Sequence, residues 1–122
     1  MQTEKQIRGA LGEQAAVDFL RKMGFILVER NYRIGYSEVD VIAQRDDELH
    51  FIEVKTRKVS SLTAPEEAIN ERKARTMRRV ASSYMSMRRL PYEPRFSMVA
   101  VEVAGNEVVN IRFIEDIVEY GW

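Results

Sequence analysis

The sequence predicts an α/β fold in which a mixed central sheet is flanked by helices. Two observations carry this prediction. The expected elements run in the order helix, three strands, helix and two strands. The third strand is largely apolar on both faces near its centre, which is typical of a strand covered on two sides. With 122 residues, 45% of them hydrophobic, the chain is long enough to bury a core, and we expect one domain spanning residues 1–122.

The first half of the chain predicts one helix and three strands. The helix begins near Thr3, a suitable N-cap, and ends near Met23, where Gly24 follows as a stop signal. Strands are expected over residues 25–34, 39–43 and 49–57. Residues 35–37 form a turn between the first two strands, and residues 44–48 form a polar turn between the second and the third. The short polar segment before the third strand has a length typical of the connection in an antiparallel hairpin.

The second half predicts one helix and two strands. After a loop over residues 58–64, a second helix is expected, with Thr63 and Glu66 as a capping box and Pro65 in its first turn. Pro91 ends that helix. Two strands over residues 95–104 and 107–114 follow, joined by a turn at Gly105-Asn106, and a short acidic segment over residues 115–122 closes the chain.

The composition limits the classes of protein and site. The chain has no cysteine, which excludes disulfides, thiolate zinc sites and a thiol nucleophile. No apolar run approaches the roughly 20 residues needed to span a bilayer. The first residues, MQTEKQIRGALGEQ, mix both charge signs and lack the apolar block of a signal peptide. We therefore expect a cytoplasmic protein without a membrane partner.

The charges are balanced overall but unevenly distributed. The formal net charge is zero, which by itself argues against a strongly basic nucleic-acid-binding protein. Between residues 72 and 89, however, the chain carries seven cations and no acid, namely Arg72, Lys73, Arg75, Arg78, Arg79, Arg88 and Arg89. This segment predicts either a local surface that attracts phosphate or simply a solvated helix face.

Three charged residues, Asp40, Glu53 and Lys55, interrupt the apolar hairpin. If the hairpin turns about Asp46 and Asp47, Asp40 lies opposite Glu53, with their Cβ atoms about 5 Å apart. Lys55 shares a face with Glu53 and lies opposite Glu38. The two carboxylates would repel each other, and a divalent cation such as Mg²⁺ would neutralise them. The alternative is an ion pair of Lys55 with Glu53 or Glu38 near a sheet edge.

Each predicted helix also places one charge on its apolar side. Glu13 is followed by Ala16, Val17 and Leu20, in the row that should face the sheet. Lys73 lies between Ile69 and Met77 in the second helix. Either residue alone is explained by a long side chain that reaches solvent from the rim of the core. Two inward charges of opposite sign favour a shared site with the hairpin residues.

The hairpin residues match a known pattern. Asp40 followed by Glu53-Val54-Lys55 resembles the PD-(D/E)xK signature of restriction-endonuclease-like nucleases. More narrowly, the chain is similar to the small bacterial UPF0102 proteins, also called the YraN family, from Gly12 to about Val101. The residues that carry this similarity are Gly12-Glu13, Gly24, Asn31-Tyr32-Arg33, Glu38-Val39-Asp40, Phe51-Ile52-Glu53-Val54-Lys55-Thr56-Arg57 and Lys73. Ser37 and Ser97 depart from the family pattern, which usually has glycine and aspartate there.

The resemblance implies a restriction-endonuclease-like (tRNA-endonuclease-like) αβββαβ core related to archaeal Holliday-junction resolvases. It implies that Asp40 and Glu53 are metal ligands together with the Val54 carbonyl, that Lys55 is the catalytic lysine, and that Glu13 completes the site. The cofactor would be Mg²⁺, with Mn²⁺ as a substitute. The residues expected to contact phosphate are Arg57, Arg72, Lys73, Arg75, Arg78 and Arg79. Related resolvases also imply a homodimer.

These expectations give one leading function and two alternatives. The leading function is a Mg²⁺-dependent endonuclease that acts on branched or structured DNA, because a chain of this length leaves little protein to read a base sequence. RNA is the second choice of substrate. The first alternative is a nucleic-acid-binding or scaffold protein that kept the fold without robust catalysis. The second makes residues 114–122 a partner-binding segment, although Ile114, Ile117 and Val118 could equally be ordinary packing.

Overall fold

The computed structural model of the chain describes residues 1–118, and its secondary structure confirms the predicted element order. The elements are α1 (Glu4–Lys22), β1 (Ile26–Ile34), β2 (Ser37–Arg45), β3 (Glu48–Lys58), the 3₁₀ helix η1 (Pro65–Ala68), α2 (Glu71–Arg88), β4 (Glu93–Ala104) and β5 (Glu107–Ile114). The five strands form one mixed sheet flanked by two helices, which is the arrangement of a restriction-endonuclease-like core.

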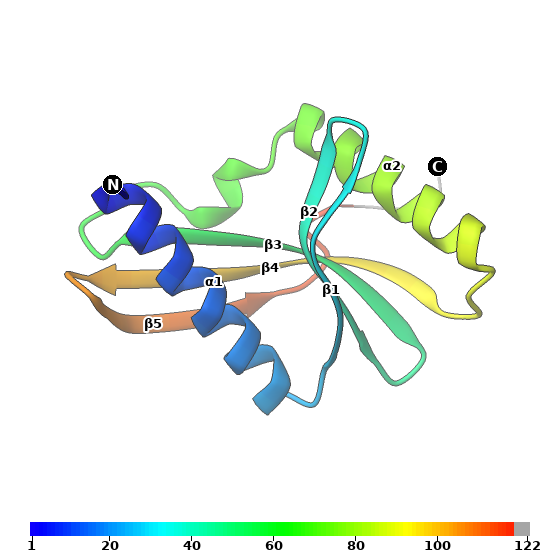
Figure 1. Cartoon of the computed structure of the whole chain (residues 1–122), viewed down its shortest axis with the longest axis horizontal. Helices are drawn as coiled ribbons and strands as arrows, with labels where there is room; N and C mark the ends of the chain where they lie inside the picture. Colours follow the sequence, from blue (N-terminus) through cyan, green and yellow to red (C-terminus); the bar gives the residue numbers. More distant parts are fainter. Residues whose placement is uncertain (119–122) are drawn as a thin grey trace.

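The strands lie in the sheet in their order along the chain, β1-β2-β3-β4-β5 (Figure 1). The pairs β1–β2, β2–β3 and β4–β5 are antiparallel, and β3–β4 is parallel. A parallel pair cannot be joined by a tight turn, because the chain must return to the other end of the sheet. The segment that contains η1 and α2 makes this crossover.

The two helices pack on opposite faces of the sheet, and alternate residues of β3 reach each of them. Leu49 and Phe51 belong to a buried cluster with Met77 and Val80 of α2. Ile52 belongs to a second cluster with Val17 and other residues of α1. Side chains alternate between the faces of a strand, so the prediction that β3 is covered on both sides is confirmed.

The ends of α1 are as predicted, whereas the predicted start of the second helix is wrong. Thr3 caps α1 in a capping box with Gln6, and Gly24 follows the C-cap with a φ of 93°. The second helix begins only at Glu71, and the Asn70 side chain accepts a hydrogen bond of 2.9 Å from the backbone N–H of Lys73. Thr63 does not act as the cap, because Arg57 donates hydrogen bonds to its hydroxyl and its carbonyl oxygen.

Residues Pro65–Ala68, predicted to open the second helix, form the separate helix η1 instead, which has no side-chain cap. The end of α2 is close to the prediction, because Arg89 takes a left-handed conformation and Pro91 follows it.

Two further features concern the membrane and the C-terminal segment. No helix in residues 1–118 is long and apolar enough to cross a membrane. Within the predicted partner-binding segment, the backbone N–H of Ile117 donates to the carbonyl oxygen of Phe96 at 3.0 Å, and Val118 is buried in the cluster on the α2 side. Ordinary packing therefore accounts for these two residues. Residues 119–122 of that segment lie outside the described part of the chain.

Gly12 sets how closely α1 approaches the sheet. A Cβ atom at this position would lie 1.8 Å from Oγ1 of Thr56 in β3, so only glycine allows the present contact. This contact places Glu13, the next residue of α1, against the strand that carries Lys55. The Gly12-Glu13 pair thus has a physical explanation in helix–strand packing.

We expect Gly12→Ala to lower the free energy of unfolding by about 1–2 kcal/mol, because the added methyl group overpacks the contact with Thr56. Gly9 is the matched control on the same helix, where an added Cβ meets nothing within 4 Å. Gly9→Ala should raise the free energy of unfolding by about 0.5–1 kcal/mol through helix propensity. Urea denaturation measures both, and equal effects of the two substitutions would contradict the packing explanation.

Candidate active site

The β2–β3 hairpin has the predicted register over most of its length. Its turn lies at Asp46 and Asp47, and Ile42 pairs with Phe51 as expected. The ladder ends, however, at the pair Val41–Ile52. Beyond it, the Oδ2 atom of Asp40 accepts a hydrogen bond of 2.8 Å from the backbone N–H of Val54.

The hydrogen bond between its side chain and the Val54 N–H therefore holds Asp40 against β3. The expected Asp40–Glu53 and Glu38–Lys55 pairs are not part of the ladder. Glu38 instead forms an ion pair of 2.8 Å with Arg33 of β1. Simple extrapolation of the register failed here because Asp40 uses its carboxylate to bond β3 where a backbone partner would otherwise stand.

One pocket collects the residues predicted for the site. Its volume is about 260 Å³. The predicted residues that line it are Glu13, Asp40, Glu53, Val54 and Lys55. They come from α1, β2 and β3, so groups far apart in the sequence meet where the β2–β3 ladder ends.

Sequence reasoning missed four residues that line the same pocket: Lys5, Arg8, Gly9 and Thr56. A signal for two of them was present in the helical spacing. Gly9 lies four residues before Glu13 and Lys5 lies eight residues before it, so all three lie on one side of α1. Arg8 lies beside this row and has no comparable signal.

The three carboxyl groups of the pocket hold their protons more tightly than usual. Burial raises the pKa of Glu53 to about 7, and the neighbouring charge of Asp40 adds to the effect against the opposing charge of Lys73. Burial also raises the pKa of Asp40, although the hydrogen bond from Val54 works in the other direction. The pKa of Glu13 is raised mainly by its burial and then by Asp40. Burial is thus the main reason that these carboxyl groups favour their protonated forms.

Lys73 of α2 is the cation that contacts this cluster. Its Nζ atom lies 3.0 Å from Oε2 of Glu53, which confirms that the side chain points inward. This Oε2 atom is buried and accepts no well-aligned hydrogen bond, so the contact is an ion pair rather than a directed bond. Lys55 forms no ion pair with any residue in the described part of the chain, so neither of the alternative pairs considered for it is present.

The donor set fits a divalent cation of the Mg²⁺ type. Among residues 1–118, no three His, Cys, Asp or Glu side chains converge closely enough to hold a metal ion by themselves. Mg²⁺ does not require three, since it is usually bound through one or two carboxylates and keeps several water molecules. Asp40 and Glu53 supply two hard oxygen donors, and the buried Oε2 of Glu53 accepts no well-aligned hydrogen bond from the described residues, although Lys73 lies 3.0 Å from it.

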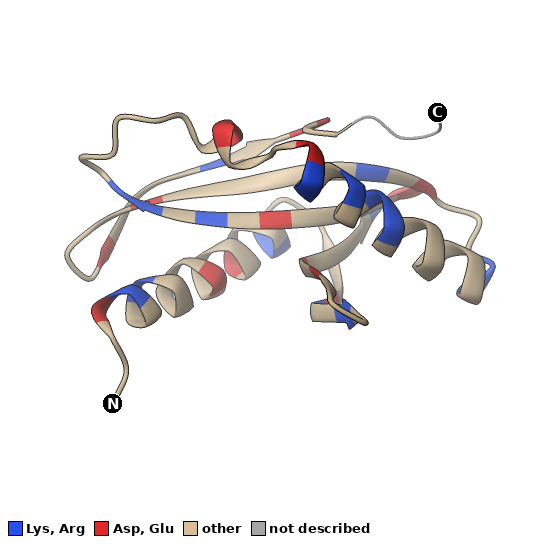
Figure 2. Cartoon of the chain, turned by 90° about the horizontal axis from the view of Figure 1, so that it is seen from above, with Lys and Arg blue, Asp and Glu red and all other residues tan. Residues whose placement is uncertain are grey.

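Some basic residues of α2 are exposed to solvent, whereas others contact groups within the protein. Figure 2 shows Lys and Arg positions following one another along this helix. Arg72, Arg75 and Arg79 are exposed, and their spacing puts them on the side of α2 away from the sheet. Arg78 forms an ion pair of 2.9 Å with Glu71, and Arg88 lies over the ring of Tyr84 at 3.9 Å.

Arg57, the remaining residue expected to contact phosphate, holds the loop after β3. Its Nη1 atom donates to Ser61 Oγ and to the carbonyl oxygen of Thr63, at 3.3 and 2.8 Å. A role in phosphate binding for Arg57 and for the arginines of α2 stays a prediction.

The two departures from the family pattern lie outside the carboxylate pocket. Ser97 is buried in β4, and its hydroxyl is 2.8 Å from Nδ1 of His50. The other ring nitrogen of His50 is 3.1 Å from Glu48. Burial lowers the pKa of His50, which favours a neutral ring in this network. Ser37 is buried at the start of β2, opposite Ile34. Neither serine lines the carboxylate pocket.

Comparisons with known proteins cover most of the chain. A family model described as "Uncharacterised protein family UPF0102" matches residues 12–101. A UPF0102 protein of Dictyoglomus thermophilum is 41% identical over 95 residues, which cover 78% of this chain and 77% of that protein. A UPF0102 protein of Moorella thermoacetica is 38% identical over 120 residues, covering 93% of this chain and 100% of that protein. The matched range includes Glu13, Asp40, Glu53, Lys55 and Lys73.

Proposed function

The chain belongs to the UPF0102 family, and from its site we propose that it is a Mg²⁺-dependent endonuclease that hydrolyses phosphodiester bonds in DNA, with branched or otherwise structured DNA as its preferred substrate. One observation carries the proposal. Glu13, Asp40, Glu53 and Lys55 meet in one pocket, where the pKa of all three carboxyl groups is raised. Within the described residues Lys73 pairs with Glu53, while Lys55 forms no ion pair. Strongly perturbed carboxylates in a cleft are typical of functional sites.

Each residue has a distinct role in this proposal. Asp40 and Glu53 hold the cation, and the carbonyl oxygen of Val54, the residue after Glu53, completes the ligand set. A bound divalent cation supplies a Lewis acid for the phosphoryl oxygens and lowers the pKa of a coordinated water. Lys55 orients the attacking water or stabilises negative charge on the phosphoryl group. Glu13, from α1, takes part in orienting water at the rim of the pocket.

DNA contacts are assigned to the exposed cations. Arg72, Arg75 and Arg79 form a basic face on α2, and Lys5 and Arg8 bring two more cations to the carboxylate pocket. Binding through such residues is to phosphate and carries little sequence information. We expect the affinity for DNA to fall steeply with salt concentration, because each neutralised phosphate releases counterions.

A second function, a nucleic-acid-binding or scaffold protein without robust catalysis, is favoured by the Lys73–Glu53 ion pair. This pair already neutralises one of the two proposed ligands at 3.0 Å. If a metal cation does not displace Lys73 from Glu53, the carboxylates serve only to fix α2 against the sheet. The raised pKa of Glu53 argues against this reading, since the pair leaves the carboxylate destabilised.

A cleavage assay separates the two functions. The protein is incubated with Mg²⁺, Mn²⁺ or EDTA on Holliday-junction, flap, single-stranded and linear duplex DNA, and on RNA copies of the same molecules. We expect metal-dependent cleavage that is fastest on junctions or flaps. Binding to these molecules without cleavage in either metal would contradict the nuclease and favour the scaffold.

A further inference from the structure

Three adjoining hollows share Arg8. It lines the carboxylate pocket, a neighbouring hollow of about 400 Å³ and an outer pocket of about 490 Å³. Lys55 and Thr56 are common to the first two, and Lys58 and Ser60 to the last two. The hollows therefore form a continuous path from the candidate active site, past the end of β3, to the turn between β4 and β5.

The middle hollow is suited to phosphate. Its cations are Arg8, Lys55, Arg57 and Lys58, and Thr56, Ser60, Ser61 and Thr63 add hydroxyl groups. No acid lines it among the residues of the described chain. Cationic and hydroxyl side chains are the usual donors to phosphate oxygens in nucleic-acid complexes. A backbone phosphate next to the scissile one thus has a matching environment.

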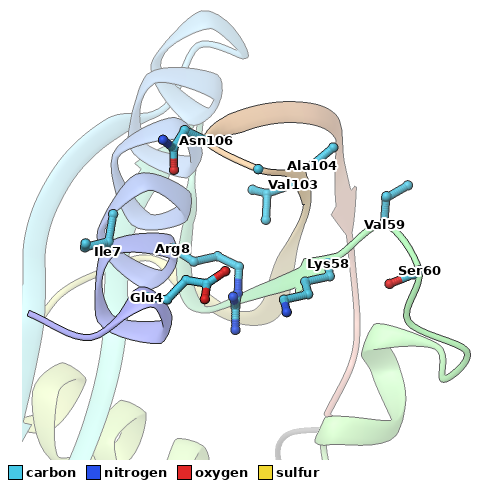
Figure 3. A pocket seen from close by; sticks show the side chains of 10 residues that line it. Glu4, Ile7, Arg8, Lys58, Val59, Ser60, Val103, Ala104 and Asn106 are labelled. Carbon is cyan, nitrogen blue, oxygen red and sulfur yellow. The ribbon is translucent and has the colours of Figure 1, made fainter.

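The outer pocket has a different chemistry. Ile7, Val59 and Val103 give it apolar walls, while Asn106 adds an amide group. Figure 3 shows the ends of Arg8 and Lys58 extending toward each other, with Glu4 beside Arg8. Because Glu4 offsets part of the positive charge, the pocket suits a flat, largely apolar group with polar edges better than a second phosphate. An apolar cavity with a few polar groups is typical of small-ligand sites of this size.

The walls of the outer pocket are fixed by the fold. The backbone N–H of Val59 donates to the carbonyl oxygen of Val103 at 2.9 Å, which ties the loop after β3 to β4. The hydrogen bonds from Arg57 to Ser61 and Thr63 hold the rest of this loop. These contacts fix the position of the loop that forms one wall of the outer pocket.

We propose that the outer pocket binds one unpaired nucleobase of the substrate, on the strand that continues from the scissile phosphate. The inference rests on the proposed function, since it assumes that the chain acts on nucleic acid. Bases stacked and paired in a duplex cannot enter such a pocket, whereas unpaired bases can. The substrate class is thus narrowed to DNA with a single-stranded segment beside the cleavage position, such as a flap or a splayed end.

Binding measurements without metal test this inference separately from cleavage. Fluorescence anisotropy in EDTA compares a blunt DNA duplex with the same duplex carrying a short single-stranded tail. We expect the unmodified protein to bind the tailed duplex about tenfold more tightly, the size of one base contact of about 1.4 kcal/mol. Ile7→Ala and Asn106→Ala, which alter the outer pocket and neither the middle hollow nor the carboxylate pocket, should remove most of this preference.

Arg21→Gln is the matched control, because Arg21 is an exposed cation in the last turn of α1. It should leave the preference for the tail unchanged. Photo-crosslinking from a thiothymidine in the tail should label peptides containing residues 58–60 or 103–106. Equal affinity for blunt and tailed DNA, or a preference that survives both pocket variants, would overturn the inference. Because no metal is present, either result leaves the cleavage assay as an independent measure of the proposed nuclease.

Discussion

Asp40→Asn is expected to lower metal-dependent cleavage by at least about 10²-fold, the usual cost of losing a group that stabilises charge in the transition state. Asparagine keeps an oxygen that can accept the hydrogen bond from the Val54 N–H, so the fold should be retained. It removes, however, the negative charge that a cation needs. We expect Mg²⁺ to raise the melting temperature of the unmodified protein, since a ligand that binds only the folded state stabilises it, and we expect Asp40→Asn to lose this rise.

Lys55→Met separates the two roles within the pocket. It should lower cleavage to a similar extent, because it removes the ammonium group that we propose orients water or stabilises the phosphoryl group. The stabilisation by Mg²⁺ should remain, since Lys55 holds no metal. Ser97→Ala serves as a control outside the pocket and should keep both properties. Cleavage that survives both Asp40→Asn and Lys55→Met would point to a contaminating nuclease and remove the basis of the site.

Most of the fold was predictable because the relevant signals are local. The apolar rows, Gly24 and the polar turn at Asp46 and Asp47 mark element ends that the structure confirms. The start of α2 was not predictable from spacing, because Thr63 has a suitable sequence position but is engaged by Arg57. Asn70 is also a good cap, and choosing between them requires knowledge of a tertiary contact.

The central residues of the site were predictable, whereas its other lining residues and its geometry were not. The periodicities of the strands and of the first helix were enough to predict that Glu13, Asp40 and Glu53 lie close together. They could not reveal that Asp40 bonds the backbone of Val54 or that Lys73 pairs with Glu53. Arg8 was missed because its importance comes from lying where three hollows meet, which is a property of the folded surface.

Glu53→Gln is expected to stabilise the metal-free protein at pH 8.5 by roughly 3 kcal/mol, even though it destroys the proposed metal site. The side chain of Glu53 is only 17% exposed, and the pKa of its carboxyl group is raised from 4.5 to about 7. Keeping this group ionised in the folded state therefore costs free energy. Glutamine has nearly the same shape without the charge, and Lys73, whose side chain is 30% exposed, can be hydrated when its partner is lost.

The effect should depend on pH in a defined direction. Below pH 4.5 the carboxyl group is protonated in both the folded and unfolded states, so it has no net effect on stability. Between pH 4.5 and about 7 the folded state binds more protons, so stability falls as the pH rises. Above about pH 7 both states are ionised and the full destabilisation is present. Urea denaturation of the two proteins should therefore give similar stabilities near pH 4.5 and diverge toward pH 8.5.

Mg²⁺ should reverse the order of the two proteins. At pH 8.5 and saturating Mg²⁺, the unmodified protein gains the free energy of metal binding, whereas Glu53→Gln gains little. The control Glu107→Gln, which removes an exposed carboxylate at the start of β5, should change stability little at either pH and with or without metal. A Glu53→Gln variant that is less stable at pH 8.5 without metal would mean that the ion pair with Lys73 outweighs the burial of Glu53. A Glu53→Gln variant that is more stable without metal and is no longer stabilised by Mg²⁺ would mean that the carboxylate serves to bind the cation. Its presence would then lower the stability of the folded state.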